Sequence, residues 1–392
     1  MRYRFGDCEL VSETRELVAG GQPCAVEPQV FDLLRHLIEH RERIVSQDEL
    51  LEAIWGGRIV SDSAISARIS AARSAIGDDG ARQQWIRTLP RHGFRFVGTV
   101  EVADTGAPMP LPPSGDRQRV AFCRSADGTR IAYGVSGSGE PLVRVGHWLT
   151  HLENDWRSPI WRPFLDRLNR RFQVVRYDQR GNGLSDWSVA DLSLDRFVED
   201  MEAVVGAAGL DRFAVYGASQ GVPIAIAYAA RHPEKVSRMV LQGGFEKGRL
   251  VRGPASEREA GEAIITLIRH GWGRRGSPFI KAFATLFIPQ ASEEQVESLV
   301  ELQRLTTSPE NAAALRAAVD QFDVGDLVEK VAAPTLVLHA SDDGVQPLEQ
   351  GRMLAARIPG AEFVLLGSAN HVILPQEPAW SVLFEAIERF FG

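Results

Sequence analysis

The sequence predicts two domains of different class, an α+β domain over residues 1–100 and an α/β domain over residues 117–392. Within the first domain, short alternating stretches precede three helical patterns. In the second, strand-like and helix-like segments alternate, which predicts a mostly parallel eight-stranded sheet with helices on both faces. A length of 392 residues also exceeds what one hydrophobic core usually serves.

Composition indicates an ordinary globular protein of a reducing compartment. The three cysteines are widely spaced and odd in number, which argues against a disulfide framework or a zinc site. The start of the chain lacks an apolar signal core, and no run approaches the roughly 18 apolar residues that span a bilayer. We therefore expect a cytoplasmic protein that uses no membrane, metal or cofactor.

The N-terminal elements follow from local patterns. Alternating stretches over residues 3–26 predict a small antiparallel sheet, and residues 28–40 an amphipathic helix with proline in its first turn. Ser46 and Glu49 form a capping box, which predicts the start of a second helix that runs to Trp55.

A third helix is predicted over residues 62–76. Its isoleucines and Ala72 recur at helical spacing and should face the core, so the opposite face carries small and hydroxylated residues. Two short strands within residues 85–97, joined by a Pro90–Gly93 turn, predict a hairpin.

This order of elements resembles the OmpR/PhoB-type winged helix-turn-helix. The stretches that carry the resemblance are Val45 to Gly56 and Ile86 to Phe96. It implies double-stranded DNA binding, with the third helix in the major groove and the Pro90–Gly93 turn as a wing along the DNA backbone or in the minor groove.

Charge is unevenly distributed in this domain. Residues 1–57 hold six arginines against eleven acids, whereas residues 58–100 hold seven arginines against three acids, although the chain's net charge is −7. Arginine forks suit both phosphates and bases. The alternative is that these arginines only solvate a helix face. The candidate DNA contacts are Ser63, Ser66, Arg68, Ser70, Arg73, Arg87, Arg91 and His92.

A helix face rich in serine predicts weak DNA affinity for one copy, so we expect a homodimer.

Residues 101–116 are rich in Pro, Gly and small side chains without periodicity, which is typical of a semi-rigid extended linker.

Ser219 is the candidate nucleophile. An apolar run ends in Gly217-Ala218-Ser219-Gln220-Gly221, which is followed by a small-residue helical segment. Such a strand-turn-helix exposes the serine hydroxyl in a strained conformation that needs glycine-sized neighbours. A chance match is the alternative for this pattern alone.

His371 and Asp343 supply the remaining groups of a catalytic triad. A neutral serine needs a histidine base, and the histidine needs a carboxylate that fixes its tautomer. Asp342 and Asp343 follow one late strand and His371 follows the last. We expect Asp343 to be the acid of the triad, because it lies four residues before Pro347. The acid has this position in relatives of the fold that the order Ser, Asp, His indicates.

With this order of Ser, Asp and His, residues 117–392 resemble the α/β-hydrolase family, as does the loop Asp178 to Asp186. The resemblance implies an oxyanion hole formed by the backbone N–H groups of Trp148 and Gln220. One departure stands out, since His147 lies where relatives carry glycine. That histidine either narrows the hole, contacts ligand or braces the loop.

Residues 243–330 form a long insertion, which in this fold implies a helical cap. Its aromatic residues would line an apolar ligand pocket, although each one alone is as compatible with a core position. The expected pocket residues are His147, Trp148, Trp272, Phe279 and Phe283.

Three functions are compatible with this sequence. In the first, a DNA-binding transcriptional regulator senses a small apolar, ester-like or lactone-like ligand through its hydrolase domain, with slow hydrolysis as a compatible side activity. In the second, an active serine hydrolase carries the DNA-binding domain for targeting or autoregulation. In the third, the hydrolase domain supplies only dimerisation. The predicted hundred-residue DNA-binding domain favours the transcriptional regulator, because a metabolic hydrolase does not need such a domain.

Overall fold

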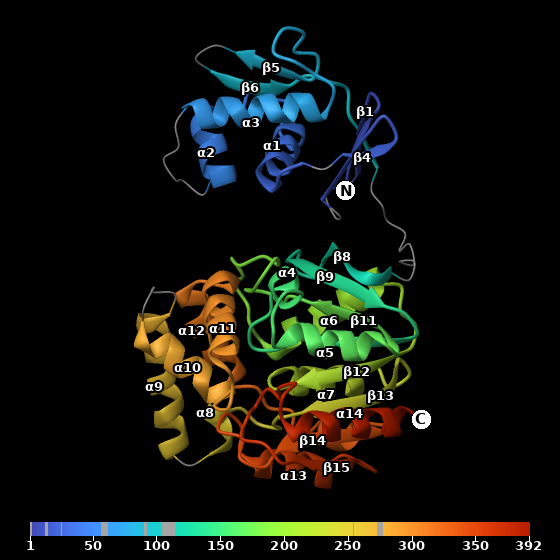
Figure 1. Ribbon diagram of the computed structural model, residues 1–392, viewed down its shortest axis with the longest axis vertical. Helices are drawn as coiled ribbons and strands as arrows, with labels where there is room; N and C mark the ends of the chain where they lie inside the picture. The colour runs from blue at the N-terminus through green and yellow to red at the C-terminus, as the bar shows by residue number, and fades with distance from the viewer. Residues whose placement is uncertain are drawn as a thin grey trace. The chain divides into compact units, whose positions relative to one another are not determined.

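A computed structural model describes residues 2–11, 15–24, 26–55, 62–89, 92–103, 114–253, 255–272 and 277–392. The chain divides into two compact units, residues 1–107 and residues 108–392. Figure 1 shows the elements of both units.

The first unit contains a five-stranded antiparallel sheet in the order β4-β3-β2-β1-β7. Its last strand, β7, pairs with β1 so that Val102 lies opposite Tyr3. The sequence does not predict β7, because three residues beside a Pro/Gly-rich stretch show no alternation. Residues 114–116, the other described end of the predicted linker, lie in β8, and residues 104–113 lie outside the described residues. The strands are β1 (Arg2–Phe5), β2 (Cys8–Val11), β3 (Glu16–Ala19), β4 (Gln22–Cys24) and β7 (Glu101–Ala103).

Three helices and a hairpin complete the first unit, in the order that the sequence predicts. The helices are α1 (Pro28–Glu39), α2 (Gln47–Trp55) and α3 (Asp62–Ala75), and the hairpin consists of β5 (Ile86–Leu89) and β6 (Gly93–Phe96). The apolar residues of the third helical pattern are buried, as their spacing predicts: Ile65, Ile69, Ala72 and Ile76.

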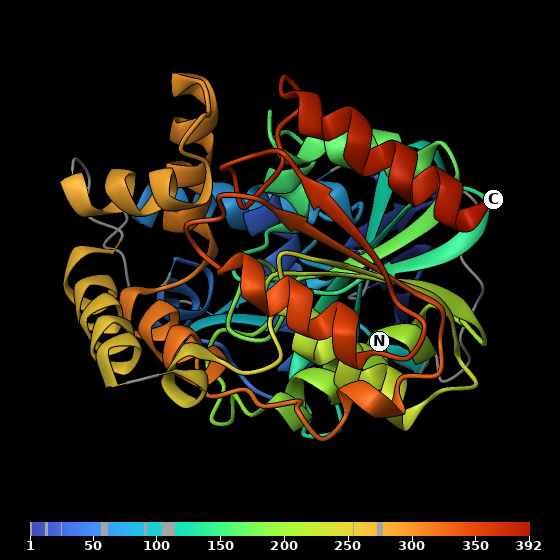
Figure 2. The same cartoon turned by 90° about the horizontal axis from the view of Figure 1, so that it is seen from below.

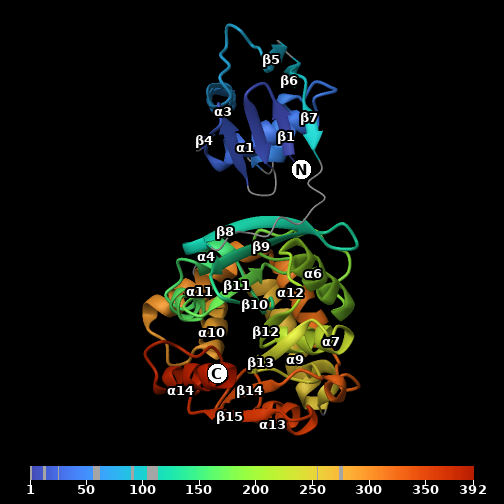
Figure 3. The same cartoon turned by 90° about the vertical axis from the view of Figure 1, so that its right-hand side faces the viewer.

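The second unit is built on an eight-stranded sheet in the order β15-β14-β13-β12-β10-β11-β9-β8. The pairs from β15 to β11 are parallel, and β9 and β8 are antiparallel to their neighbours (Figure 3). This is the mostly parallel sheet that the sequence predicts. The strands are β8 (Ser114–Arg124), β9 (Arg130–Gly137), β10 (Glu140–Arg144), β11 (Phe172–Tyr177), β12 (Phe213–Ala218), β13 (Val236–Gln242), β14 (Thr335–Ala340) and β15 (Glu362–Leu366).

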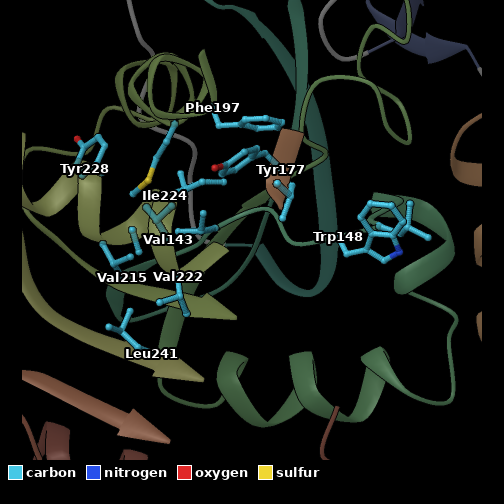
Figure 4. Close-up of a cluster of buried hydrophobic side chains, with 14 of the residues drawn as sticks. Val143, Trp148, Tyr177, Phe197, Val215, Val222, Ile224, Tyr228 and Leu241 are labelled. Carbon is cyan, nitrogen blue, oxygen red and sulfur yellow. The ribbon is translucent and has the colours of Figure 1, made fainter. Parts of the chain in front are cut away.

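Helices cover both faces of this sheet. Alternate strand residues point to opposite faces, so Val215 joins the core with α6 and α7, whereas Tyr216 joins the core with α5 and α14. Figure 4 shows strand residues such as Val143 and Leu241 beside Val222 and Ile224 of α7. These helices are α5 (Trp161–Asn169), α6 (Leu194–Ala207), α7 (Gly221–Arg231) and α14 (Pro378–Phe391), with α13 (Leu348–Arg357) after β14 and the short α4 (Leu152–Asp155) after β10.

The insertion after β13 is helical and lies to one side of the sheet (Figure 2). It contains α8 (Arg249–Arg252), α9 (Ala255–Gly271), α10 (Pro278–Phe287), α11 (Glu293–Thr306) and α12 (Pro309–Val319), and η1 (Val328–Lys330) leads back to β14. The backbone ties this cap to the body, since His371 N donates to Phe287 O at 2.9 Å and Gly183 N donates to Thr306 O at 2.8 Å. Within the described part of the chain, no helix has both the length and the apolar character needed to cross a membrane.

Candidate functional site

Ser219 sits in a strained turn between β12 and α7. Its φ of 53° lies in the left-handed region, which a non-glycine residue rarely adopts. The flanking glycines are needed for close packing, because a Cβ on Gly217 would lie 2.9 Å from the carbonyl oxygen of Gly221, and one on Gly221 would lie 3.1 Å from that of Gly146. The turn therefore projects the serine from the carboxyl end of the sheet, where ligands bind in such folds.

Asp343 and His371 come together from the loops after β14 and β15. The Nδ1 atom of His371 lies 2.6 Å from Asp343 Oδ2, and Asp343 Oδ1 accepts from Val345 N at 2.8 Å and from Gln346 N at 2.9 Å. Burial opposes ionisation, but the neighbouring His371 and the two N–H groups lower the pKa of Asp343 below its ordinary value. The ionised carboxylate favours the proton on Nδ1, which leaves Nε2 free to act as a base.

The alternative acid, Asp342, has a different place. It accepts a hydrogen bond from the Ser341 hydroxyl at 2.6 Å, and its N–H donates to Ser368 O at 3.0 Å. Asp342 thus shapes the turn, while Asp343 contacts the imidazole.

A pocket connects the serine and the histidine. Ser219 and His371 both line it, and the cap contributes Phe287, Leu299 and Gln303. Two of the expected lining residues, His147 and Trp148, are present in its wall.

The other three expected pocket residues do not line this pocket. Trp272 and Phe283 are buried against each other with ring centroids 5.7 Å apart, and Phe279 packs on Phe283 at 5.6 Å. The wall instead contains Phe287, which lies one helical turn after Phe283. The sequence places all of these aromatics in the cap, but only tertiary packing decides which ring reaches the pocket.

The loop that carries the expected oxyanion groups is braced by amide side chains. Gln220 Nε2 donates to Gln179 Oε1 at 2.5 Å, and Gln179 Nε2 donates to Trp148 O at 3.1 Å. Asn182 Nδ2 donates to the same carbonyl at 3.2 Å. These hydrogen bonds link Trp148 to Gln220, the two residues whose backbone N–H groups are expected to face the oxyanion. The sequence gives no signal for the role of Gln179 beyond its place in the Asp178 to Asp186 loop.

His147 is buried in the pocket wall. Its ring packs on Trp161 at 4.7 Å, and among the described residues its Nε2 atom has no hydrogen-bond partner. Burial and the nearby charge of Arg144 hold its pKa well below the ordinary value, so the ring is neutral at neutral pH. A neutral imidazole here offers one polar atom to a ligand.

Sequence reasoning missed Arg144, the last residue of β10. Its side chain lines the same pocket and is only 3% exposed. A single arginine in a strand pattern gives no sign of burial, so only the structure identifies it as part of the site.

One cluster of potential metal ligands occurs among the described residues, His36, His40 and Glu49 in the first unit. Glu49, however, accepts two hydrogen bonds from Arg43 at 2.6 and 2.7 Å and lies 2.9 Å from His36 Nε2. The Arg43 contact, with a smaller contribution from His36, lowers the pKa of Glu49 to about 2. The cluster is an ion-pair network in this structure.

The exposed face of α3 carries the small polar residues that the sequence places there. Ser66 and Ser70 are exposed on this helix, as are Arg87 on β5 and His92 at the hairpin turn. Arg91 and the side chain of Ser63 lie outside the described residues.

Two arginines expected at DNA have other contacts. Arg73 is 7% exposed, and its guanidinium donates to Ile86 O and to the Thr88 hydroxyl, each at 2.8 Å. It ties α3 to the hairpin and is buried there, so the guanidinium of Arg73 is not exposed for a DNA contact. Arg68 is partly exposed, 3.0 Å from Glu27, and bonded to Gln29 at 3.2 Å.

Comparison with known families assigns both units. Residues 21–96 match the model described as "Transcriptional regulatory protein, C terminal", and residues 151–262 match the model described as "alpha/beta hydrolase fold". The chain therefore combines an OmpR/PhoB-type winged helix-turn-helix DNA-binding domain with an α/β-hydrolase domain. The first implies DNA as a partner, and the second implies a small-molecule substrate.

Several similar proteins are named as hydrolases. A pimeloyl-[acyl-carrier protein] methyl ester esterase of Nitrosomonas europaea is 26% identical over 60% of this chain and 90% of its own length. A putative carbamate hydrolase of Agrobacterium fabrum is 28% identical over 56% of this chain and 84% of its own. Among solved structures, an esterase from Exiguobacterium antarcticum matches with a TM-score of 0.58 and 20% identity, over 69% of this chain and 99% of its own.

Proposed function

We propose that this chain is a transcriptional regulator whose hydrolase domain binds a small ester-like or lactone-like ligand and thereby changes DNA binding. The observation that carries the proposal is the presence, in one chain, of a DNA-binding fold and a pocket lined by both Ser219 and His371, whose imidazole contacts Asp343. A hydrolase of metabolites does not need a DNA-binding fold, and a simple DNA-binding protein does not need a pocket with these catalytic groups.

The residues of the pocket support acyl transfer as its chemistry. Ser219 Oγ attacks the ligand carbonyl while His371 Nε2 takes its proton, and the ionised Asp343 stabilises the resulting imidazolium. The alcohol or lactone oxygen leaves with that proton, and an acyl-serine forms. Water then attacks the acyl group with His371 again as base. The N–H groups of Trp148 and Gln220 are our candidates for stabilising the oxyanion.

A second candidate is an active serine hydrolase for which the DNA-binding domain serves targeting or autoregulation. It is favoured by the short His371–Asp343 contact and by relatives named as esterases. In the regulator, turnover is slow and pocket occupancy alters DNA affinity. In the hydrolase, turnover is fast and DNA affinity does not respond to the pocket.

Dimerisation and a cytoplasmic location belong to the same proposal. The exposed face of α3 offers Ser66 and Ser70, and Arg73 is turned inward. Few phosphate contacts from one copy imply weak binding, so two copies on neighbouring half-sites are expected.

Two measurements on the full chain test this function. A fluorophosphonate probe should label wild type and leave Ser219→Ala unlabelled, and footprinting should show a protected DNA site that changes when candidate esters are added. Equal labelling of Ser219→Ala would exclude Ser219 as the nucleophile. If the probe labels wild type but selection from a random DNA library yields no bound site, the regulator is excluded and the serine hydrolase remains as the function.

A further inference from the structure

The pocket contains a buried cation with no counterion in direct contact. Arg144 is 3% exposed, and among the residues that the structure describes its guanidinium makes no hydrogen bond or ion pair, with Nε fully enclosed. Burial lowers the pKa of Arg144 to about 10, so the group remains charged at neutral pH. A buried charge without a partner is costly, and proteins retain one only where something compensates it.

Three other buried arginines in the described part of this unit have an acid in direct contact. Arg176, which pairs with Arg144 across the β10–β11 register, lies 2.9 Å from Asp155 Oδ2 and donates to Leu152 O at 2.6 Å. Arg180 contacts Asp200 at 2.6 Å, and Arg316 contacts Asp320 at 2.8 Å. The difference between Arg144 and these residues is therefore specific to its position in the pocket.

Asp155 acts on Arg144 without a direct contact. Asp155 interacts with it through space, but the only carboxylate oxygen of Asp155 that has a partner among the described residues is held by Arg176. Burial, only partly offset by Arg176, raises the pKa of Asp155 to about 6. Arg144 and Arg176 thus both interact with Asp155, and Arg176 interacts with Asp178 as well. Among the described residues no carboxylate contacts Arg144 directly, which leaves positive charge at this end of the pocket.

Aromatic residues of the pocket wall surround the guanidinium of Arg144. Its guanidinium carbon lies 4.8 Å from the ring centroid of Trp161 and 5.5 Å from that of Phe164, and both rings line the pocket. The Tyr216 hydroxyl donates to Gln242 Oε1, and these two residues line the pocket as well. Contact with these aromatic faces holds the planar guanidinium in place, and a carboxylate accepts two parallel hydrogen bonds from such a group.

We propose that Arg144 binds a carboxylate of the ligand, so that the hydrolase domain recognises an organic acid that also presents a carbonyl to Ser219. The inference rests on the proposed role of this pocket as the ligand site, and it narrows the ligand class from ester-like or lactone-like compounds to those that also carry a carboxylate. The competing role for Arg144 is a structural one, in which its contacts with Trp161 and Phe164 alone hold the pocket wall.

Protection of Ser219 from a fluorophosphonate probe tests the inference in the full-length protein. Benzoate and 3-phenylpropanoate are compared with benzamide and 3-phenylpropanamide, which have similar shapes without the charge. In wild type, the acids should protect at concentrations about 10- to 100-fold lower than the amides, the range that a charge-assisted hydrogen bond gives. In Arg144→Gln this difference should disappear, and Arg144→Lys should restore part of it.

The same ligands, followed by the melting temperature of the protein, separate the possible failures. If the probe labels Ser219 but acids and amides protect it equally in wild type, or neither protects it, the carboxylate site is excluded. The assignment of Ser219 as the nucleophile is then retained. If the probe labels nothing, the nucleophile assignment fails. In that case a rise in melting temperature with acids in wild type, absent in Arg144→Gln, supports the carboxylate site, and no rise excludes it. A preference for acids that persists in Arg144→Gln also overturns the proposal.

Discussion

At the scale of single residues, the hydrogen bond that His371 Nδ1 donates to Asp343 decides the proposed chemistry. The carboxylate is enclosed and its second oxygen is held by two backbone N–H groups, so it has one orientation. We expect Asp343→Asn to lower the rate of 4-nitrophenyl acetate hydrolysis by about 10⁴-fold, because the amide stabilises the wrong histidine tautomer. The neighbouring Asp342→Asn is the matched control and should retain wild-type activity. Equal losses in both variants would contradict the assignment of the acid.

Two neighbouring buried arginines should differ in their effect on stability. Arg176→Met leaves the buried Asp155 without its direct partner, which costs about 3–5 kcal/mol of unfolding free energy. Arg144→Met removes a charge that has no direct partner and should cost much less or stabilise the unit. Urea unfolding of the hydrolase unit in the full chain, followed by loss of Ser219 labelling, measures both. A larger loss for Arg144→Met would show that this arginine supports the fold rather than the ligand.

At the scale of elements, Asp78 organises the loop between α3 and the hairpin. Its carboxylate accepts hydrogen bonds from the N–H groups of Asp79, Gln84, Trp85 and Ile86 at 2.8–3.0 Å. We expect Asp78→Ala to lower the stability of the first unit by about 2 kcal/mol, since it leaves several N–H groups unpaired. Asp79→Ala, at an exposed residue of the same turn, should cost less.

The same carboxylate predicts a pH dependence. Burial opposes ionisation of Asp78, but the N–H groups of Ile86, Trp85 and Gln84 outweigh it, so the folded-state pKa lies below the ordinary value. The stabilisation is therefore complete above the unfolded pKa of about 3.9 and is lost as the pH falls through the lower folded pKa. Acid unfolding of wild type and Asp78→Asn should converge at low pH. A stability difference that stays constant down to the lowest pH would contradict this account.

DNA affinity should depend on Arg87 and not directly on Arg73. Arg87 is exposed on the hairpin, so Arg87→Ala should weaken binding to all sequences and reduce the slope of log K against log salt by about 1. Arg73→Ala should mainly lower the melting temperature of the first unit, because it removes the bonds to Ile86 and Thr88. Arg124→Ala, exposed in the hydrolase unit, serves as the control. Loss of affinity in Arg73→Ala without loss of stability would return Arg73 to the DNA-contacting residues.

The sequence predicts elements more reliably than it predicts contacts within the pocket. The eight strands and the three N-terminal helices follow from periodicity, which depends on the chain alone. Strand β7 depends on pairing with the distant β1, and the choice of Phe287 over Phe283 depends on the docking of the cap. The unpaired state of Arg144 is likewise a tertiary property, because nothing near it in sequence states what it contacts.

At the scale of the whole molecule, one chain contains a DNA-binding unit and a pocket that is proposed to bind a carboxylate-bearing ligand. Such coupling requires that occupancy of the pocket changes the affinity for DNA, typically by about 5- to 150-fold. Neither unit alone can show this, so the full chain is needed.

The most direct measurement is the dissociation constant of the full chain for its selected DNA site before and after phosphonylation of Ser219. We expect a change of about 5-fold or more in wild type and none in Ser219→Ala, which cannot be phosphonylated at this residue. An unchanged dissociation constant in fully phosphonylated wild type, and also with every carboxylate that protects Ser219, would contradict the central claim and leave a hydrolase with an independent DNA-binding domain.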